Sequence, residues 1–116
     1  MITELAFVAT PITDMNRARA FYEGVLGLKP THDFNGQWIE YTIPEGTFAI
    51  TNIEADWKPS SQGTAVGFEV DDLEATMQTL KAAGTPLVMD VIETPVCRMA
   101  IVADPDGNHV TLHKRK

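Results

Sequence analysis

The sequence predicts an α+β fold built from two β-α-β-β-β modules, in each of which a helix covers one face of a mixed sheet. Two amphipathic helical segments start near Asp14 and Asp72, which lie 58 residues apart, half the length of the 116-residue chain. One short strand pattern precedes each helix and three follow it, with a Pro-acid-Gly turn before the last strand of both halves. We interpret this order as an internal duplication, although the halves share little identity.

The helix of the first half carries its apolar residues at i, i+3, i+4, i+7 and i+8, which is typical of one buried stripe. These residues are Ala18, Phe21, Tyr22, Val25 and Leu26. Thr13 or Asp14 is suited to cap its start, and Gly27 stands where a left-handed residue ends a helix. Strands are predicted at residues 5–10, 28–34, 37–43 and 47–52. Asn35-Gly36 and Pro44-Glu45-Gly46 supply the turns between the last three.

The second half repeats this pattern. A strand over residues 63–70 precedes a helix with Leu73, Met77 and Leu80 on one face and Gly84 past its end. Glu74, three residues after Asp71, fits a capping box. Strands follow at residues 87–93, 97–103 and 109–113. The turn at residues 104–107 has Pro and Gly where a type I turn favours them.

Length and composition favour one cytoplasmic domain over residues 1–116, with a first module at 1–52, a linker at 53–62 and a second module at 63–116. The net charge of −7 argues against a nucleic-acid partner, because the only basic run is the tail at residues 114–116. No apolar run is long enough to span a membrane, and an acid near the N-terminus argues against a signal peptide. A single cysteine, Cys97, excludes an internal disulfide and a cysteine-rich zinc module.

Two motifs stand out. They are Asp14-x-x-Arg17-Ala18-x-x-Phe21-Tyr22-x-x-Val25-Leu26-Gly27-Leu28 and Asp104-Pro105-Asp106-Gly107-Asn108-x-Val110-x-Leu112. Through these motifs, in this order, the whole chain resembles the vicinal oxygen chelate superfamily of glyoxalase I, bleomycin- and fosfomycin-resistance proteins and extradiol dioxygenases. The resemblance implies paired modules whose sheets curve around a central cleft, with the helices outside. It also implies a homodimer with two clefts.

The resemblance assigns the metal ligands of the superfamily to four cleft positions. Counted from the motifs, these positions are Phe7, Ile50, Ala65 and Thr111. Only the threonine has a side-chain donor atom, so we expect no metal and no other cofactor; a divalent ion would require that the register is misread. His109 and His113 offer no alternative, because four residues of strand span about 13 Å. His32 and Asp33 point to opposite faces of their strand.

Strand alternation then predicts which side chains line the cleft and bind a ligand. The candidates are Phe7, Trp38, Ile50, Ala65, Glu69, Arg98, Thr111 and His113. The superfamily register turns Arg98 and Ala100 inward and turns Met99 and Ile101 toward the helix. Glu69, His113 and Arg98 are also the catalytic candidates.

Each candidate has a structural alternative. Arg98 is suited to anchor a carboxylate or phosphonate, or to form a salt bridge with Glu69 or Glu93. His113 is a general base or a residue of the surface or of a dimer contact. Glu69 is a base, a partner for a cationic group, or a partner of Arg98. Cys97 is a structural thiol or a nucleophile.

These observations favour a metal-free small-molecule binding protein of the glyoxalase/bleomycin-resistance type, with a small, cationic or aromatic organic ligand. The alternative is a glyoxalase-like lyase, isomerase or dioxygenase, either metal-dependent or using Glu69, His113 and Arg98. A third hypothesis is an interaction module whose cleft is filled by its own Phe7, Ile50 and Trp38.

Overall fold

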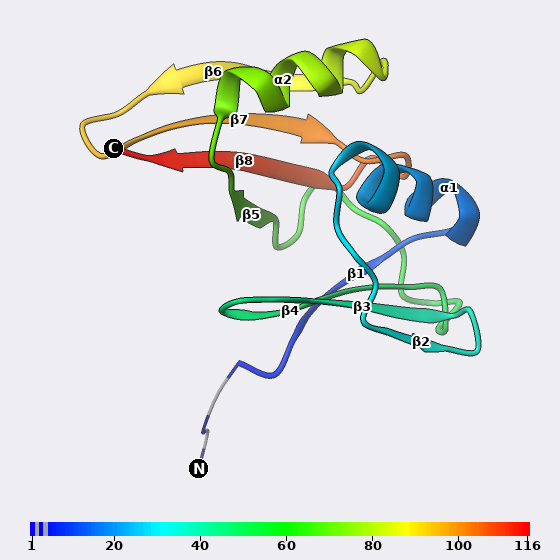
Figure 1. The fold of residues 1–116 in the computed structure, drawn as a ribbon. Helices are drawn as coiled ribbons and strands as arrows, with labels where there is room; N and C mark the ends of the chain where they lie inside the picture. The colour runs from blue at the N-terminus through cyan, green and yellow to red at the C-terminus, as the bar shows by residue number, and fades with distance from the viewer. Residues whose placement is uncertain (2, 4) are drawn as a thin grey trace. The chain divides into compact units, whose positions relative to one another are not determined.

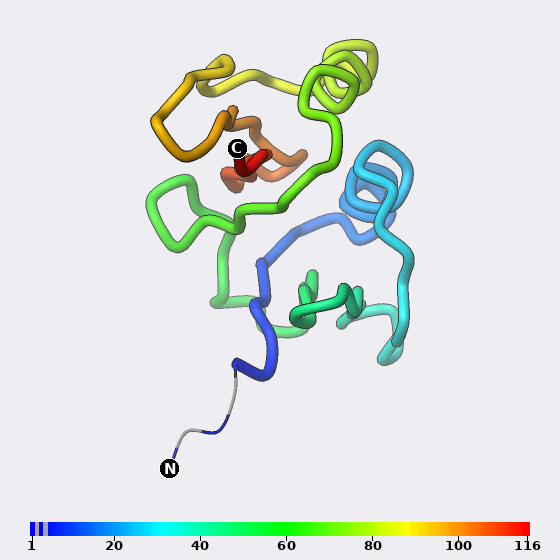
Figure 2. The backbone as a smooth tube through the Cα atoms, turned by 60° about the vertical axis from the view of Figure 1, so that its left-hand side comes forward, coloured from blue at the N-terminus to red at the C-terminus, as the bar shows by residue number. Residues whose placement is uncertain are grey.

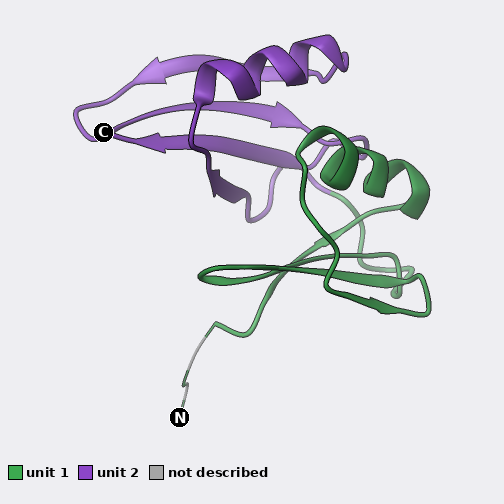
Figure 3. Ribbon diagram, in the orientation of Figure 1, with its two compact units in different colours: residues 1–59 green, residues 60–116 purple. Residues whose placement is uncertain are grey.

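The computed structural model describes Met1, Thr3 and residues 5–116. These residues form two compact units, Met1–Pro59 and Ser60–Lys116 (Figure 3). The boundary falls inside the segment expected to be the linker. Each unit contains one strand, a helical segment and three further strands, in that order (Figure 1). The predicted α+β class and the repeated β-α-β-β-β order are therefore confirmed.

The first unit is a four-stranded mixed sheet with one helical segment. Its elements are β1 (Val8–Pro11), α1 (Met15–Arg19), the π-helical segment η1 (Ala20–Val25), β2 (His32–Phe34), β3 (Trp38–Ile43) and β4 (Gly46–Thr51). The strand order is β1-β4-β3-β2, with β1 parallel to β4 and the other pairs antiparallel. The first strand begins at Val8 rather than at the expected Leu5, because its ladder with β4 starts there. The Asn35-Gly36 hairpin is confirmed by positive φ angles of 56° and 67°.

Asp14 caps the helix of the first unit; it is one of the two caps predicted from the sequence, and Thr13 is the other. Its carboxylate accepts the backbone N–H of Arg17 at 3.1 Å. Gly27 ends the segment with a φ of 77°, which is also as predicted. No pattern in the sequence predicts that the second half of this segment widens into a π-helix, where the N–H of Leu26 donates to the carbonyl of Phe21 at 2.9 Å.

The second unit repeats this architecture. Its elements are β5 (Val66–Glu69), α2 (Leu73–Ala82), β6 (Leu87–Glu93), β7 (Cys97–Ala103) and β8 (His109–Arg115), in the strand order β5-β8-β7-β6. The predicted capping box is wrong. The N-cap is Asp72, whose carboxylate accepts the N–H of Ala75 at 3.0 Å, so Glu74 does not occupy the capping-box position.

Each helix lies on one side of the sheet of its own unit (Figures 1 and 2). In the first unit, Tyr22 of η1 packs against Phe48 of β4 with ring centroids 5.2 Å apart. In the second, α2 covers the side of β8 that carries the buried Val110 and Leu112. We call the opposite side of each sheet its far face. Residues that are directly opposite each other in a strand ladder have their side chains on the same face of the sheet. The helix contacts of one strand therefore show, for every paired residue, whether it lies on the helix side or on the far face.

Two predicted face assignments are wrong. Ile50 was expected on the far face, but it lies two residues from Phe48 on the helix side and is completely buried. Arg98 and Ala100 were also expected there, but Ala100 pairs with Leu112 and is buried on the helix side. Met99 and Ile101, expected under the helix, therefore lie on the far face. A one-residue slip in register turns every side chain of a strand to the other face.

Candidate functional site

The far face of the first unit carries an aromatic and acidic cluster on adjacent strands. Trp38 and Glu40 lie two residues apart on β3, and the indole Nε1–H donates to the Glu40 carboxylate at 3.0 Å. The ring of Phe7 meets that of Trp38 edge to face, with centroids 5.1 Å apart. His32, opposite Glu40 on β2, places its Nδ1 3.5 Å from the same carboxylate. A half-buried carboxylate beside an indole face suits a cationic group.

The far face of the second unit carries a carboxylate–imidazole pair. Glu69 of β5 faces His113 of β8 in the ladder, and its Oε1 lies 2.6 Å from His113 Nδ1. Its Oε2 accepts the backbone N–H of Arg115 at 2.7 Å. The hydrogen bond from Arg115, followed by the one from His113, lowers the pKa of Glu69 below its usual value. Glu69 thus finds its partners on β8 and not in Arg98.

Apolar side chains surround this pair. Met99 of β7 lies directly opposite His113, and Ile101 lies opposite Thr111, all of them only partly exposed. Gly67 lies opposite Thr111 on the other neighbouring strand, where a side chain would contact the threonine Cβ at 3.9 Å. Next to the pair, the far face is therefore largely apolar apart from the hydroxyl of Thr111.

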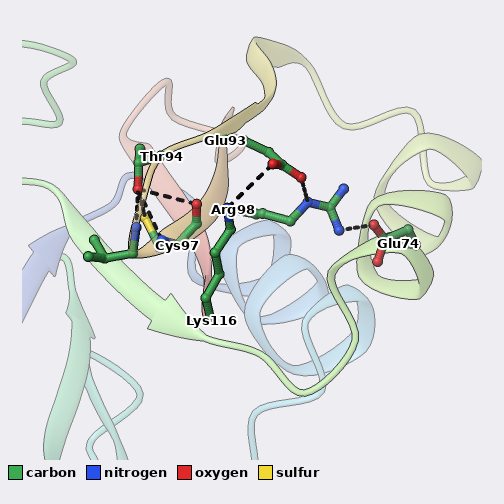
Figure 4. Close-up of polar contacts among 7 residues, drawn as sticks. Glu74, Glu93, Thr94, Cys97, Arg98 and Lys116 are labelled. Atoms are coloured by element: carbon green, nitrogen blue, oxygen red, sulfur yellow. Dashed lines mark hydrogen bonds and ion pairs between the residues drawn. The ribbon is translucent and has the colours of Figure 1, made fainter.

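Arg98 lies on the helix side of the second unit and takes part in a salt-bridge network (Figure 4). Its Nη1 pairs with the carboxylate of Glu74 on α2, and its Nε lies 3.3 Å from that of Glu93 on β6. Lys116 Nζ reaches the same Glu93 carboxylate at 3.4 Å. The bond from Arg98 lowers the pKa of Glu74. Of the two roles considered for Arg98, the structure supports the salt bridge. Glu93 is one of the two partners expected for it, and Glu69 is not in contact with it.

Cys97 is buried at the start of β7, where Thr94 holds the preceding turn (Figure 4). The hydroxyl of Thr94 accepts the N–H of Cys97 at 3.0 Å and lies 3.2 Å from its Sγ. This placement supports the structural alternative for Cys97.

The residues at the four metal positions do not fit a metal ion. Phe7 and Ala65 have no donor atom, and Ile50 is turned to the helix side. The far-face positions next to Ile50 are Ala49, which has no donor atom, and Thr51, whose buried hydroxyl donates to the carbonyl of Gln37 at 2.7 Å. Correcting the register therefore supplies no free ligand. Within the described part of the chain, no three His, Cys, Asp or Glu side chains come together as a metal site.

The structure brings together some of the expected ligand-binding residues and separates others. Phe7 and Trp38 meet on one far face, and Glu69, Thr111 and His113 share the other. The site prediction missed Glu40, Met99 and Ile101. Glu40 was recognisable from its alternation with Trp38, whereas β7 is apolar on both faces and its pattern fits either register.

The structure defines a protein of duplicated β-α-β-β-β units with polar pairs on helix-free sheet faces. The model of the Glyoxalase/Bleomycin resistance protein/Dioxygenase superfamily matches residues 4–112, so the chain belongs to this superfamily. It is 27% identical to a protein described as "Probable lactoylglutathione lyase" from Vibrio parahaemolyticus, over 90% of this chain and 86% of that one.

Solved structures show the same fold. TnmS3, an antibiotic binding protein from Streptomyces sp. CB03234, superposes with a TM-score of 0.83 at 22% identity, covering 99% of this chain and 98% of that one. Lactoylglutathione lyase from Agrobacterium tumefaciens gives a TM-score of 0.77 at 19% identity, covering 98% and 95%. No helix in the described residues is long and apolar enough to cross a membrane.

Proposed function

We propose that this chain is a small-molecule binding protein that holds its ligand without a metal ion. The observation that carries the proposal is the chemistry of the superfamily's metal positions, where Phe7, Ile50 and Ala65 offer no donor atom. The hydroxyl of Thr111 alone does not hold a transition metal. Binding then depends on the far-face side chains themselves.

The first unit favours a cationic or aromatic ligand. Trp38 and Phe7 present ring faces and edges, and the Glu40 carboxylate next to them supplies a negative charge. A cation over an indole gains about 0.5–2 kcal/mol, depending on how far it is desolvated. The net charge of −7 also favours a cation over an anion.

Two measurements test this proposal together. The protein is incubated with nickel, zinc, manganese or ferrous ions, desalted and analysed by plasma mass spectrometry. Bleomycin and a panel of smaller aromatic amines are then titrated by calorimetry in EDTA. We expect almost no bound ion, together with binding that Glu40→Gln weakens and Trp57→Phe leaves unchanged. Trp57 is the control because it lies between β4 and β5, outside the strands that form the sheets.

The competing function is a lyase, as the name of the Vibrio relative suggests, and the superfamily resemblance implies that such an enzyme would be metal-dependent. Close to one ion per chain, with turnover of lactoylglutathione, would overturn the binding proposal. So would the absence of binding by bleomycin and by every amine in the panel.

We also propose that the protein is a homodimer, as the superfamily resemblance implies. The edge strand β6 exposes the apolar side chains of Leu87, Val88 and Ile92, which association could remove from water. Sedimentation velocity tests this proposal. A single species with the mass of one chain across the micromolar range would contradict it.

A further inference from the structure

The carboxylate–imidazole pair of the second unit has a geometry that fixes one proton. Both oxygens of Glu69 are occupied, Oε1 by His113 Nδ1 at 2.6 Å and Oε2 by the N–H of Arg115 at 2.7 Å. The two side chains leave neighbouring strands at paired positions, so the strand ladder itself holds them together. The imidazole therefore has a defined orientation.

The tautomer of His113 follows from its partner. A carboxylate that accepts two hydrogen bonds is an acceptor only, so His113 Nδ1 must be the donor. The neutral imidazole then carries its lone pair on Nε2. No described residue forms a hydrogen bond with Nε2, and the side chain is 30% exposed. A ligand can therefore reach a hydrogen-bond acceptor that is already oriented.

The surroundings of His113 select the kind of ligand. Met99 lies opposite His113 in the ladder. Ile101 lies two residues further along β7, on the same face. A third charged group, the guanidinium of Arg115, places its Nη1 3.8 Å from Glu69 Oε1 and is mostly exposed. Lys114 alternates to the helix side with Arg98. An apolar body on Met99 and Ile101, carrying one hydroxyl that reaches Nε2, matches this surface.

We propose that Glu69 and His113 form a binding site for a weakly acidic hydroxyl, such as that of a phenol or enol, on a ligand with a flat apolar body. His113 touches the ligand through Nε2, and Glu69 is a positioning residue that fixes the tautomer. This inference rests on the proposed binding function. It adds that the ligand carries a hydroxyl group that donates a hydrogen bond.

The other role open to the pair is structural, because it also ties the end of β5 to β8. A merely structural pair would affect stability but would not discriminate between a phenol and its methyl ether. A structural role also does not require that His113 keep a single tautomer, and the tautomer can be measured by spectroscopy. The experiment therefore measures tautomer and discrimination separately.

The first part of the experiment is long-range ¹H–¹⁵N NMR of the free protein, which resolves the tautomer of each imidazole. The chain has three histidines, so the spectrum is simple to assign. We expect the Nδ1–H form for His113 and a mixture of tautomers in Glu69→Gln, where the amide offers both donor and acceptor. An Nε2–H form in the native protein would overturn the proposal.

The second part compares phenol with anisole, in which a methyl group replaces the hydroxyl proton. At about pH 8 the phenol keeps its proton and the imidazole is neutral. We expect the native protein to bind the phenol roughly tenfold or more tightly, the effect of a hydrogen bond to a charge-supported group. His113→Phe should abolish this preference, and Glu69→Gln should reduce it. His109→Phe is the matched control, since His109 lies on the same strand and face.

The outcomes separate this inference from the proposed function. If neither probe binds, or both bind equally, the hydroxyl site is refuted, while binding of bleomycin or an amine in EDTA still supports the general function. If bound metal and lyase turnover refute the general function, the NMR tautomer still reports on the pair. Loss of the preference in His109→Phe as well would also count against the site.

Discussion

Asn108 donates two hydrogen bonds to the carboxylate of Asp104, one from its backbone N–H at 2.8 Å and one from its side-chain amide at 2.9 Å. Both residues are buried, and the amide oxygen of Asn108 accepts the N–H of Ser60 at 3.0 Å. The second superfamily motif therefore has a structural task in this chain. The motif stabilises the turn between β7 and β8, and its Asn108 binds the backbone of Ser60 at the start of the second unit.

Replacement of Asp104 by alanine should lower the free energy of unfolding by about 2–3 kcal/mol, because buried donors lose a charged acceptor. Urea denaturation monitored by circular dichroism measures the change. Asp71→Ala is the control, since Asp71 is exposed, and should stay within about 0.5 kcal/mol. Equal effects of the two substitutions would show that the buried carboxylate is not the cause.

Two glycines of the first helical segment should respond in opposite ways. Gly24 lies inside η1, and a Cβ there would meet nothing within 4 Å, so Gly24→Ala should stabilise the protein by about 0.4–1 kcal/mol. Gly27 has a φ of +77°, where a Cβ is strained, so Gly27→Ala should destabilise by about 1 kcal/mol. Thermal unfolding of both variants gives the signs. Stabilisation by Gly27→Ala would contradict the assigned helix end.

The Arg98–Glu74 pair should make stability depend on acid pH. Its hydrogen bond lowers the pKa of Glu74 below 4.5, so the contribution is present at neutral pH and is lost as the pH falls through the lowered pKa. We expect Glu74→Gln to reduce the difference in unfolding free energy between about pH 7 and about pH 3.5. Glu45→Gln, in the exposed turn before β4, is the control and should leave the difference unchanged.

Much of the fold could be predicted from short-range signals. Asp14 as cap, the Asn35-Gly36 hairpin and the bounds of β6 and β7 depend on residues close in sequence, whose conformational preferences act locally. The π-helical geometry of η1 has no comparable signal. Within this segment Tyr22 packs against Phe48 of β4, a contact between residues distant in sequence that a local pattern does not reveal.

The candidate site was harder to predict because it depends on strand faces. Glu69 and His113 were placed correctly together, since β5 and β8 alternate between large apolar and other residues. Arg98 was placed on the wrong face, because β7 has apolar residues at both odd and even positions. The salt bridge to Glu74 on α2 joins residues distant in sequence, and this pairing decides the face of Arg98.

Tyr41 should make stability depend on alkaline pH in the opposite sense. Its hydroxyl donates to the Glu23 carboxylate at 2.8 Å from a buried position, and burial together with this bond raises the pKa of the phenol above its usual 10.0. The folded protein therefore keeps a proton that the unfolded chain loses as the pH rises above 10.0, so stability falls there. Tyr41→Phe should cost about 1–2 kcal/mol at about pH 8 and show a weaker alkaline decline. Urea denaturation at about pH 8 and about pH 11 measures both effects. An undiminished decline in the variant would assign it to other groups and contradict the role of the Tyr41–Glu23 bond.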